Sequence, residues 1–232
     1  MNASLHDELL DLAATFDGRW DRFGCVERCL PATTDPIEAA RALLAKNPGE
    51  PEVKGLLALF LFLDARRGAR LSAEGAYVPL DTQDIGLWRW ESIEEAEGLL
   101  RSAFTAGRIG GFQLEAAIQS AYVARKRRGV DVRKDVERLY EALVACSPTL
   151  RSRVGRCGAL MESQGAERAL GAISKIDRRQ ASEYQPYWAV LAEIHRRLWS
   201  GDEATKAYDV ALELCDDAAV RSFLIARRSS VE

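Results

Sequence analysis

Residues that could bind a ligand or a protein partner gather in one part of the sequence. Asp64 is followed within two helical turns by three arginines, and further polar residues and a tryptophan come before the next helix. Guanidinium groups suit carboxylates and phosphates, and a tryptophan ring offers a flat apolar wall. The predicted partner or ligand site consists of Asp64, Arg66, Arg67, Arg70, Gln83, Asp84, Trp88 and Gln113.

Two interpretations of this group are open. On the functional interpretation, it binds a protein partner or closes a small-molecule pocket around Asp64 and Trp88. On the structural interpretation, it is an ion-pair network that ties a long loop to a core helix, because ordered loops need anchors. Since charges near a core are costly unless paired, we expect Asp64 to hold an arginine, for which its own helix supplies candidates.

The densest basic run is Arg125-Lys126-Arg127-Arg128. It could contact nucleic acid or an acidic partner, but cations at the end of a helix also suit the helix dipole. The whole chain carries a formal net charge of −3, whereas nucleic-acid binders usually show a basic excess. We therefore expect no direct nucleic-acid binding.

Catalytic and metal-binding patterns are weak in this sequence. Cys25 and Cys29 share one helical face, but a metal site needs two further ligands and no histidine is nearby in sequence, so packing of two small apolar side chains is the favoured explanation. His6 and His195 are the only histidines and lie far apart in the chain. The sequence has no nucleophile elbow, phosphate loop or dinucleotide fingerprint. It therefore predicts no catalytic residue, metal or cofactor.

The helix that must position the arginines covers residues 50–70 and is apolar almost all round, which predicts burial between neighbouring helices. Proline and capping residues predict helix starts at Asp35-Pro36, at Pro51 and at Ser92, which forms a capping box with Glu95. Residues 72–84 are the least helical, so one long ordered loop is expected near 72–90. The longest apolar run, residues 56–63, is too short to cross a membrane.

Small residues recur in a helical register. Ala204, Ala207, Tyr208 and Ala211 share one helical face. Ala169 begins the same pattern 35 residues before Ala204 (204 − 169), which is close to the tetratricopeptide period of about 34 residues. Small residues let a neighbouring helix approach closely. The predicted fold is all-α, a tetratricopeptide-like stack of antiparallel helix pairs that forms a right-handed α-solenoid. It is predicted as one helical-repeat domain over 1–232, with N-terminal helices at 1–49, central helices and the loop at 50–130, and repeats at 131–232.

A series of motifs, taken in order, resembles a known family. The motifs are EPEVKGLLALFLFLDARRGAR, VPLDTQDIGLW, GGFQLEAAIQSAY, LYEALVACSP, EATKAYDVALEL and FLIARR, with an aromatic-acid-glycine motif at 16–20. Together they are similar to the C-terminal, tetratricopeptide-like extension of a subgroup of extracytoplasmic-function RNA polymerase sigma factors. The sequence departs from that pattern at Leu63 and Tyr122, where histidines are expected, and at Gly155, where asparagine is usual.

The resemblance implies a role in regulating sigma activity. Possible partners are a sigma factor, RNA polymerase or a small YCII-like protein. Nothing in the chain, which starts with its own methionine, resembles the promoter-binding sigma domains, so we expect that it does not direct polymerase to a promoter unaided. Five scattered cysteines and the lack of a signal-peptide pattern fit the cytoplasm.

The hypothesis from sequence is a cytoplasmic, non-enzymatic protein-interaction module related to transcription. The alternative is a small-molecule-sensing domain with its pocket around Asp64 and Trp88.

Overall fold

The structure, a computed structural model, describes residues 3–15 and 35–231. Within these ranges it contains eleven α-helices, three short 3-10 helices and no β-strand. The predicted all-α class is therefore confirmed. The helix expected at 21–30, the motif at 16–20, Trp20 and the Cys25–Cys29 pair lie outside the described residues. By their contacts, the described residues divide into unit 1 (3–15, 35–69 and 84–132) and unit 2 (70–83 and 133–231).

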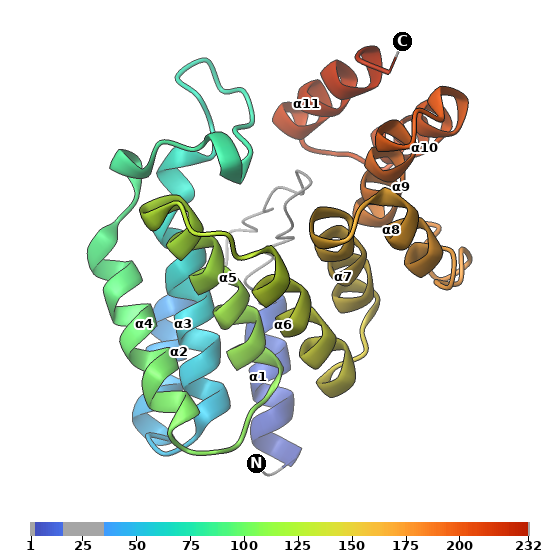
Figure 1. Ribbon diagram of the computed structural model, residues 1–232. Helices are drawn as coiled ribbons and strands as arrows, with labels where there is room; N and C mark the ends of the chain where they lie inside the picture. Colours follow the sequence, from blue (N-terminus) through green and yellow to red (C-terminus); the bar gives the residue numbers. More distant parts are fainter. Residues whose placement is uncertain (1–2, 16–34, 232) are drawn as a thin grey trace. The chain divides into compact units, whose positions relative to one another are not determined.

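Unit 1 is built around the apolar helix α3 (Pro51–Ala65), which packs against α2 (Pro36–Lys46), α4 (Trp90–Phe104) and α5 (Gly111–Arg128) (Figure 1). The N-terminal helix α1 (Ala3–Thr15) contacts α2 and α3. All residues of α3 from Gly55 to Leu63 are buried. The predicted burial of this helix is confirmed, because neighbours on several sides cover an apolar surface that runs almost all round it.

The predicted helix starts are partly confirmed. Asp35 caps α2 by accepting a hydrogen bond from the backbone N–H of Ile37 at 2.9 Å, and prolines occupy the first position of α2 and of α3. The capping box at Ser92 is wrong, because α4 already begins at Trp90 and Ser92 lies inside its first turn. The backbone N–H of Arg89 donates to the carbonyl oxygen of Ala65 at 2.9 Å, and this tertiary bond fixes the start of the helix.

The stretch between α3 and α4 is ordered by short elements. The 3-10 helices η1 (Arg67–Ala69) and η3 (Ile85–Leu87) belong to unit 1, and η2 (Leu80–Thr82) belongs to unit 2. A small hairpin has an isolated bridge between Leu71 and Tyr77 and a turn at Gly75, whose φ of +80° suits glycine. The predicted ordered loop is thus present, but it is interrupted by these helical turns.

Unit 2 contains α6 (Arg133–Cys146), α7 (Leu150–Ser163), α8 (Ala166–Ile173), α9 (Gln185–Arg197), α10 (Gly201–Glu213) and α11 (Ala218–Ser229). Each helix packs against the next one in the chain, and α7 also contacts α9. The small residues of the predicted register, Ala169, Ala207 and Ala211, are buried in one core with Tyr208. Close helix packing at these positions is what their small size predicts.

No helix in the described part of the chain combines the length and the apolar character needed to cross a bilayer.

Candidate functional site

The predicted site residues are divided between the two units. Unit 1 holds Asp64, Arg66, Arg67, Asp84, Trp88 and Gln113, and unit 2 holds Arg70 and Gln83.

Asp64 anchors the start of α4 to the end of α3. Its carboxylate lies 3.2 Å from Nε of Arg67 and also pairs with the guanidinium of Arg89. Beside this pair, the backbone of Arg89 bonds to Ala65. The expectation that Asp64 holds an arginine is confirmed, and for Asp64 the structural interpretation accounts for the charge.

Asp64→Asn is expected to lower the free energy of unfolding by about 1 kcal/mol, because both arginine partners are more than half exposed and screened by solvent. Urea titration followed by circular dichroism measures this change. Glu97→Gln removes a longer pair, at 3.8 Å, with the 73% exposed Arg101 and is the matched control, with an expected change of less than about 0.5 kcal/mol. Equal stability of the two variants would show that Asp64 is not an anchor.

Two arginine side chains flank a pair of tryptophans next to this anchor, and we name Arg66, Trp88, Trp90 and Arg127 the Arg–Trp ladder. The guanidinium of Arg66 lies 5.9 Å from the centre of the Trp88 ring, and that of Arg127 lies 5.0 Å from the centre of the Trp90 ring. The two tryptophan rings are 5.9 Å apart. Cations over aromatic faces attract the ring electrons, so the ladder holds its members in fixed positions.

The inner end of the ladder is buried. Arg66 is buried and donates from Nη2 to Oε1 of Gln119 at 2.5 Å. Trp88 is also buried, and its Nε1 has no hydrogen-bond partner among the described residues. A buried N–H without a partner is costly, so this donor is available to an incoming acceptor.

The outer end of the ladder reaches the surface. Leu87 is 56% exposed beside it, Arg127 is exposed, and Trp90 is half-buried with its Nε1 bonded to the carbonyl oxygen of Ile85 at 3.2 Å. Trp90 is therefore only partly exposed. In unit 2, Trp199 is 94% exposed with a φ of +57°.

Gln113 is fully buried and serves the packing of α5 on α3. Its Nε2 donates to Oε1 of Glu52 at 3.1 Å and to the carbonyl oxygen of Arg108 at 2.9 Å. Glu52 also accepts hydrogen bonds from the backbone N–H groups of Phe112 and Gln113, at 3.1 and 3.2 Å. A carboxylate from α3 thus caps the N-terminus of α5, where negative charge is favourable.

Two glycines make this cap possible. A Cβ atom at Gly110 would overlap the Glu52 carboxylate, and one at Gly55 would lie 2.6 Å from the backbone nitrogen of Gln113. Sequence reasoning missed Glu52 and Gly55. The Gly110-Gly111 pair at the start of α5 was the available signal of a close approach.

The remaining predicted residues support the loop locally. Gln83 is buried and donates from Nε2 to the carbonyl oxygen of Val78 at 3.1 Å. Asp84 caps η3 by accepting from the N–H of Gly86 at 2.8 Å. Arg70 is buried, and its carbonyl oxygen closes the hairpin by accepting from the N–H of Val78.

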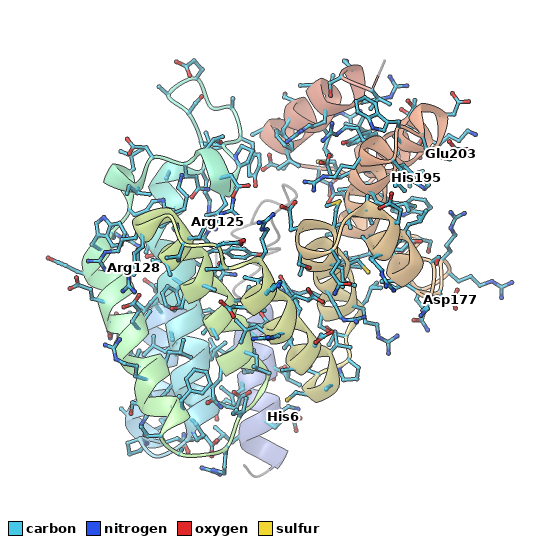
Figure 2. The ribbon with its side chains drawn as sticks, in the orientation of Figure 1. His6, Arg125, Arg128, Asp177, His195 and Glu203 are labelled. Carbon is cyan, nitrogen blue, oxygen red and sulfur yellow. The ribbon has the colours of Figure 1, made fainter. Side chains whose placement is uncertain are left out.

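The basic run occupies the last turn of α5, where Figure 2 labels Arg125 and Arg128. Gly129 ends the helix in the left-handed conformation, and its N–H donates to the carbonyl oxygen of Arg125. All four cations lie in this last turn, where positive charge suits the helix dipole.

The histidines lie on separate helices, His6 on α1 and His195 on α9 (Figure 2). Burial lowers the pKa of His195, Glu203 raises it and Arg178 lowers it, and the net shift is downward. In the described part of the chain, no three acidic, cysteine or histidine side chains come close enough to hold a metal ion.

The three positions at which the sequence departs from the sigma-extension pattern that it resembles are in close contact with neighbouring residues. Leu63 and Tyr122 are buried, and Gly155 on α7 faces the ring of Tyr140 on α6. A Cβ at position 155 would lie 2.5 Å from Cε1 of Tyr140. An asparagine at this position would therefore require the tyrosine ring to move.

Comparison with known proteins gives a family match in this region. Residues 32–104 match the family described as "Family of unknown function (DUF6596)". That range covers α2, α3, the ordered loop and α4, and with them every predicted site residue except Gln113.

An uncharacterized protein of Rhizobium meliloti (strain 1021) is 31% identical over 190 residues, which are 82% of this chain and 45% of that protein. The chain thus spans less than half the length of this relative. No solved structure matches the chain.

Proposed function

We propose that the chain is a non-enzymatic, cytoplasmic protein-interaction module that regulates transcription in the manner of sigma-factor extensions. The motif series and the family match over 32–104 support the kinship. Consecutive packing of α6 to α11 around buried small residues supports a tetratricopeptide-like stack in unit 2.

The observation that carries the proposal is the outer end of the Arg–Trp ladder. Leu87 is exposed and precedes Trp88 of the ladder in the chain, Arg127 is exposed over the Trp90 ring, and tryptophan and arginine are enriched at the centres of protein interfaces. The ladder holds these side chains in place before binding, which reduces the entropy lost on association.

The charged residues near Leu87 in the chain and on the ladder indicate which kind of partner surface would bind here. Arg67, Arg89 and Arg127 are all exposed. Of these three cations, Arg67 and Arg89 both pair with the carboxylate of Asp64, and Arg127 does not. We therefore assign an acidic protein surface with an apolar pocket for Leu87 as the partner. A sigma factor, RNA polymerase or a small YCII-like protein are the candidates.

The test is biolayer interferometry with the immobilised full chain and three purified analytes: RNA polymerase core enzyme, an extracytoplasmic-function sigma factor and a YCII-like protein. We expect one of them to bind and Leu87→Asp to weaken binding at least about tenfold. Ile109→Asp changes an equally exposed apolar residue of unit 1 and is the matched control. Absence of binding to all three, or equal binding by the two variants, would refute the proposal.

The alternative is a small-molecule sensor around Asp64 and Trp88. The buried, unpartnered Nε1 of Trp88 favours it, because a ligand oxygen would satisfy this donor.

A further inference from the structure

Unit 2 contains a pocket of about 620 Å³ between α6, α7 and α8 and the residues that follow α8. None of the eight residues predicted from sequence lines it. Small-molecule sites in proteins have volumes of about 300–1,000 Å³, so this pocket has the size of a ligand site.

The deeper part of the pocket is apolar. Cys157 and Leu160 of α7 and Ile176 after α8 are buried and line it. Burial raises the pKa of the Cys157 thiol to about 11, against a smaller lowering by Arg156. The thiol is therefore neutral at physiological pH and forms part of an apolar wall.

The rim of the pocket is basic. Four cations line it, Arg153, Arg156, Arg168 and Lys175, against the carboxylates of Glu141 and Glu167. Arg156 lies 3.6 Å from Glu141, so this pair neutralises itself in part.

The other three cations of the rim have no such partner among the described residues. In 3–15 and 35–231, no carboxylate lies within ion-pair distance of Arg153, Arg168 or Lys175. An anion that enters the pocket would therefore gain these cations without displacing an ion pair between described residues.

We propose that this pocket binds a small organic anion with an apolar body and a carboxylate or phosphate group. The apolar part lies against Cys157, Leu160 and Ile176, and the anionic group faces Arg168 and Lys175. This site lies outside the interaction surface proposed above and adds a ligand-binding function to unit 2.

The probe for this proposal is 8-anilinonaphthalene-1-sulfonate, an anion with an apolar body whose fluorescence rises in apolar surroundings. We expect one binding site per chain. The double variant Arg168→Glu and Lys175→Glu is expected to weaken binding about tenfold or more, since two favourable charges become repulsive. The double variant Lys134→Glu and Lys206→Glu reverses two exposed cations, on α6 and α10, outside the pocket and is the charge-matched control.

Gly171→Leu blocks the pocket without changing its charge. Gly171 lines the pocket within α8, and a Cβ at this position would have no atom within 4 Å, so the new side chain enters open space. Because leucine also favours the helix, the fold is retained. We expect this variant to lose probe binding while circular dichroism shows an unchanged melting temperature or a higher one.

Competition identifies the anionic group. Displacement of the probe by phenyl phosphate or by phenylacetate supports the proposal and distinguishes phosphate from carboxylate recognition. Probe binding that is equal in the wild type, the double variant and Gly171→Leu would overturn the proposal. Displacement only by a polyglutamate peptide would overturn the assignment to a small molecule.

Discussion

Gly55→Ala is expected to lower the free energy of unfolding by about 2–3 kcal/mol, although alanine is the better helix former. The added methyl group would lie 2.6 Å from the backbone nitrogen of Gln113 and 3.0 Å from its Cα. Backbone atoms cannot relieve this clash by a change of rotamer, as a flexible side chain can. Helix α5 must therefore move away from α3, which lengthens the hydrogen bonds from α5 to Glu52.

Gly98→Ala is the matched control for this substitution. Gly98 lies in α4, and the nearest atom to a Cβ at this position is an Arg101 nitrogen at 4.0 Å. Without a clash, alanine should raise stability by about 0.5–1 kcal/mol. Urea titration followed by circular dichroism compares the two variants, and a stabilised Gly55→Ala variant would contradict the close approach of α3 and α5.

Glu193→Gln is expected to lower the free energy of unfolding by about 3 kcal/mol, because it leaves charged partners of a buried carboxylate uncompensated. Glu193 is buried and accepts two hydrogen bonds from Arg196, at 2.8 and 2.9 Å, and one from Arg197 at 3.0 Å. Tyr208 of α10 adds a fourth at 3.3 Å. Arg197 also donates to Glu162 of α7 at 2.6 Å, so the network joins three helices.

The Glu193 network should also give an acid-dependent loss of stability. Burial alone would raise the pKa of Glu193, but the hydrogen bonds and charges of Arg196 and Arg197 outweigh it and lower the pKa. The stabilisation is therefore complete above the ordinary glutamate pKa of about 4.3 and is lost as the pH falls through the lowered value in the folded state. The difference between the wild type and Glu193→Gln should shrink across that range.

Asp209→Asn is the control for Glu193. Asp209 pairs with Arg228 at 2.6 Å, but both side chains are more than a third exposed, so the expected loss is at most about 1 kcal/mol. Equal losses for Asp209→Asn and Glu193→Gln at pH 7, or a difference that grows with acidification, would show that the buried network does not stabilise unit 2.

Much of the helical framework could be predicted because its causes are local. Asp35 and Pro36 start α2 through contacts within one turn, and Pro51 opens α3 in the same way. The failure at Ser92 has a tertiary cause, since the backbone bond from Arg89 to Ala65 starts α4 three residues early. Local capping preferences amount to about 1 kcal/mol, and one well-placed tertiary bond can outweigh them.

The candidate site was less predictable than the framework. The sequence placed Asp64 near arginines, and the structure pairs it with Arg67 and Arg89. The sequence could not show whether Gln113 faces a ligand or, as in the structure, supports the Glu52 cap. Glutamine suits both roles, and the choice depends on the residue that packs opposite it.

The amino-acid sequence by itself determined the all-helical class, the burial of α3 and the small-residue faces of unit 2, because each follows from the residue types and periodicity of one segment. The tertiary structure alone decided that Glu52 caps a helix 60 residues away, that Arg66 and Arg127 flank the pair Trp88 and Trp90, and that basic residues line a pocket in unit 2. These features join side chains from different helices, and their distances depend on how those helices pack.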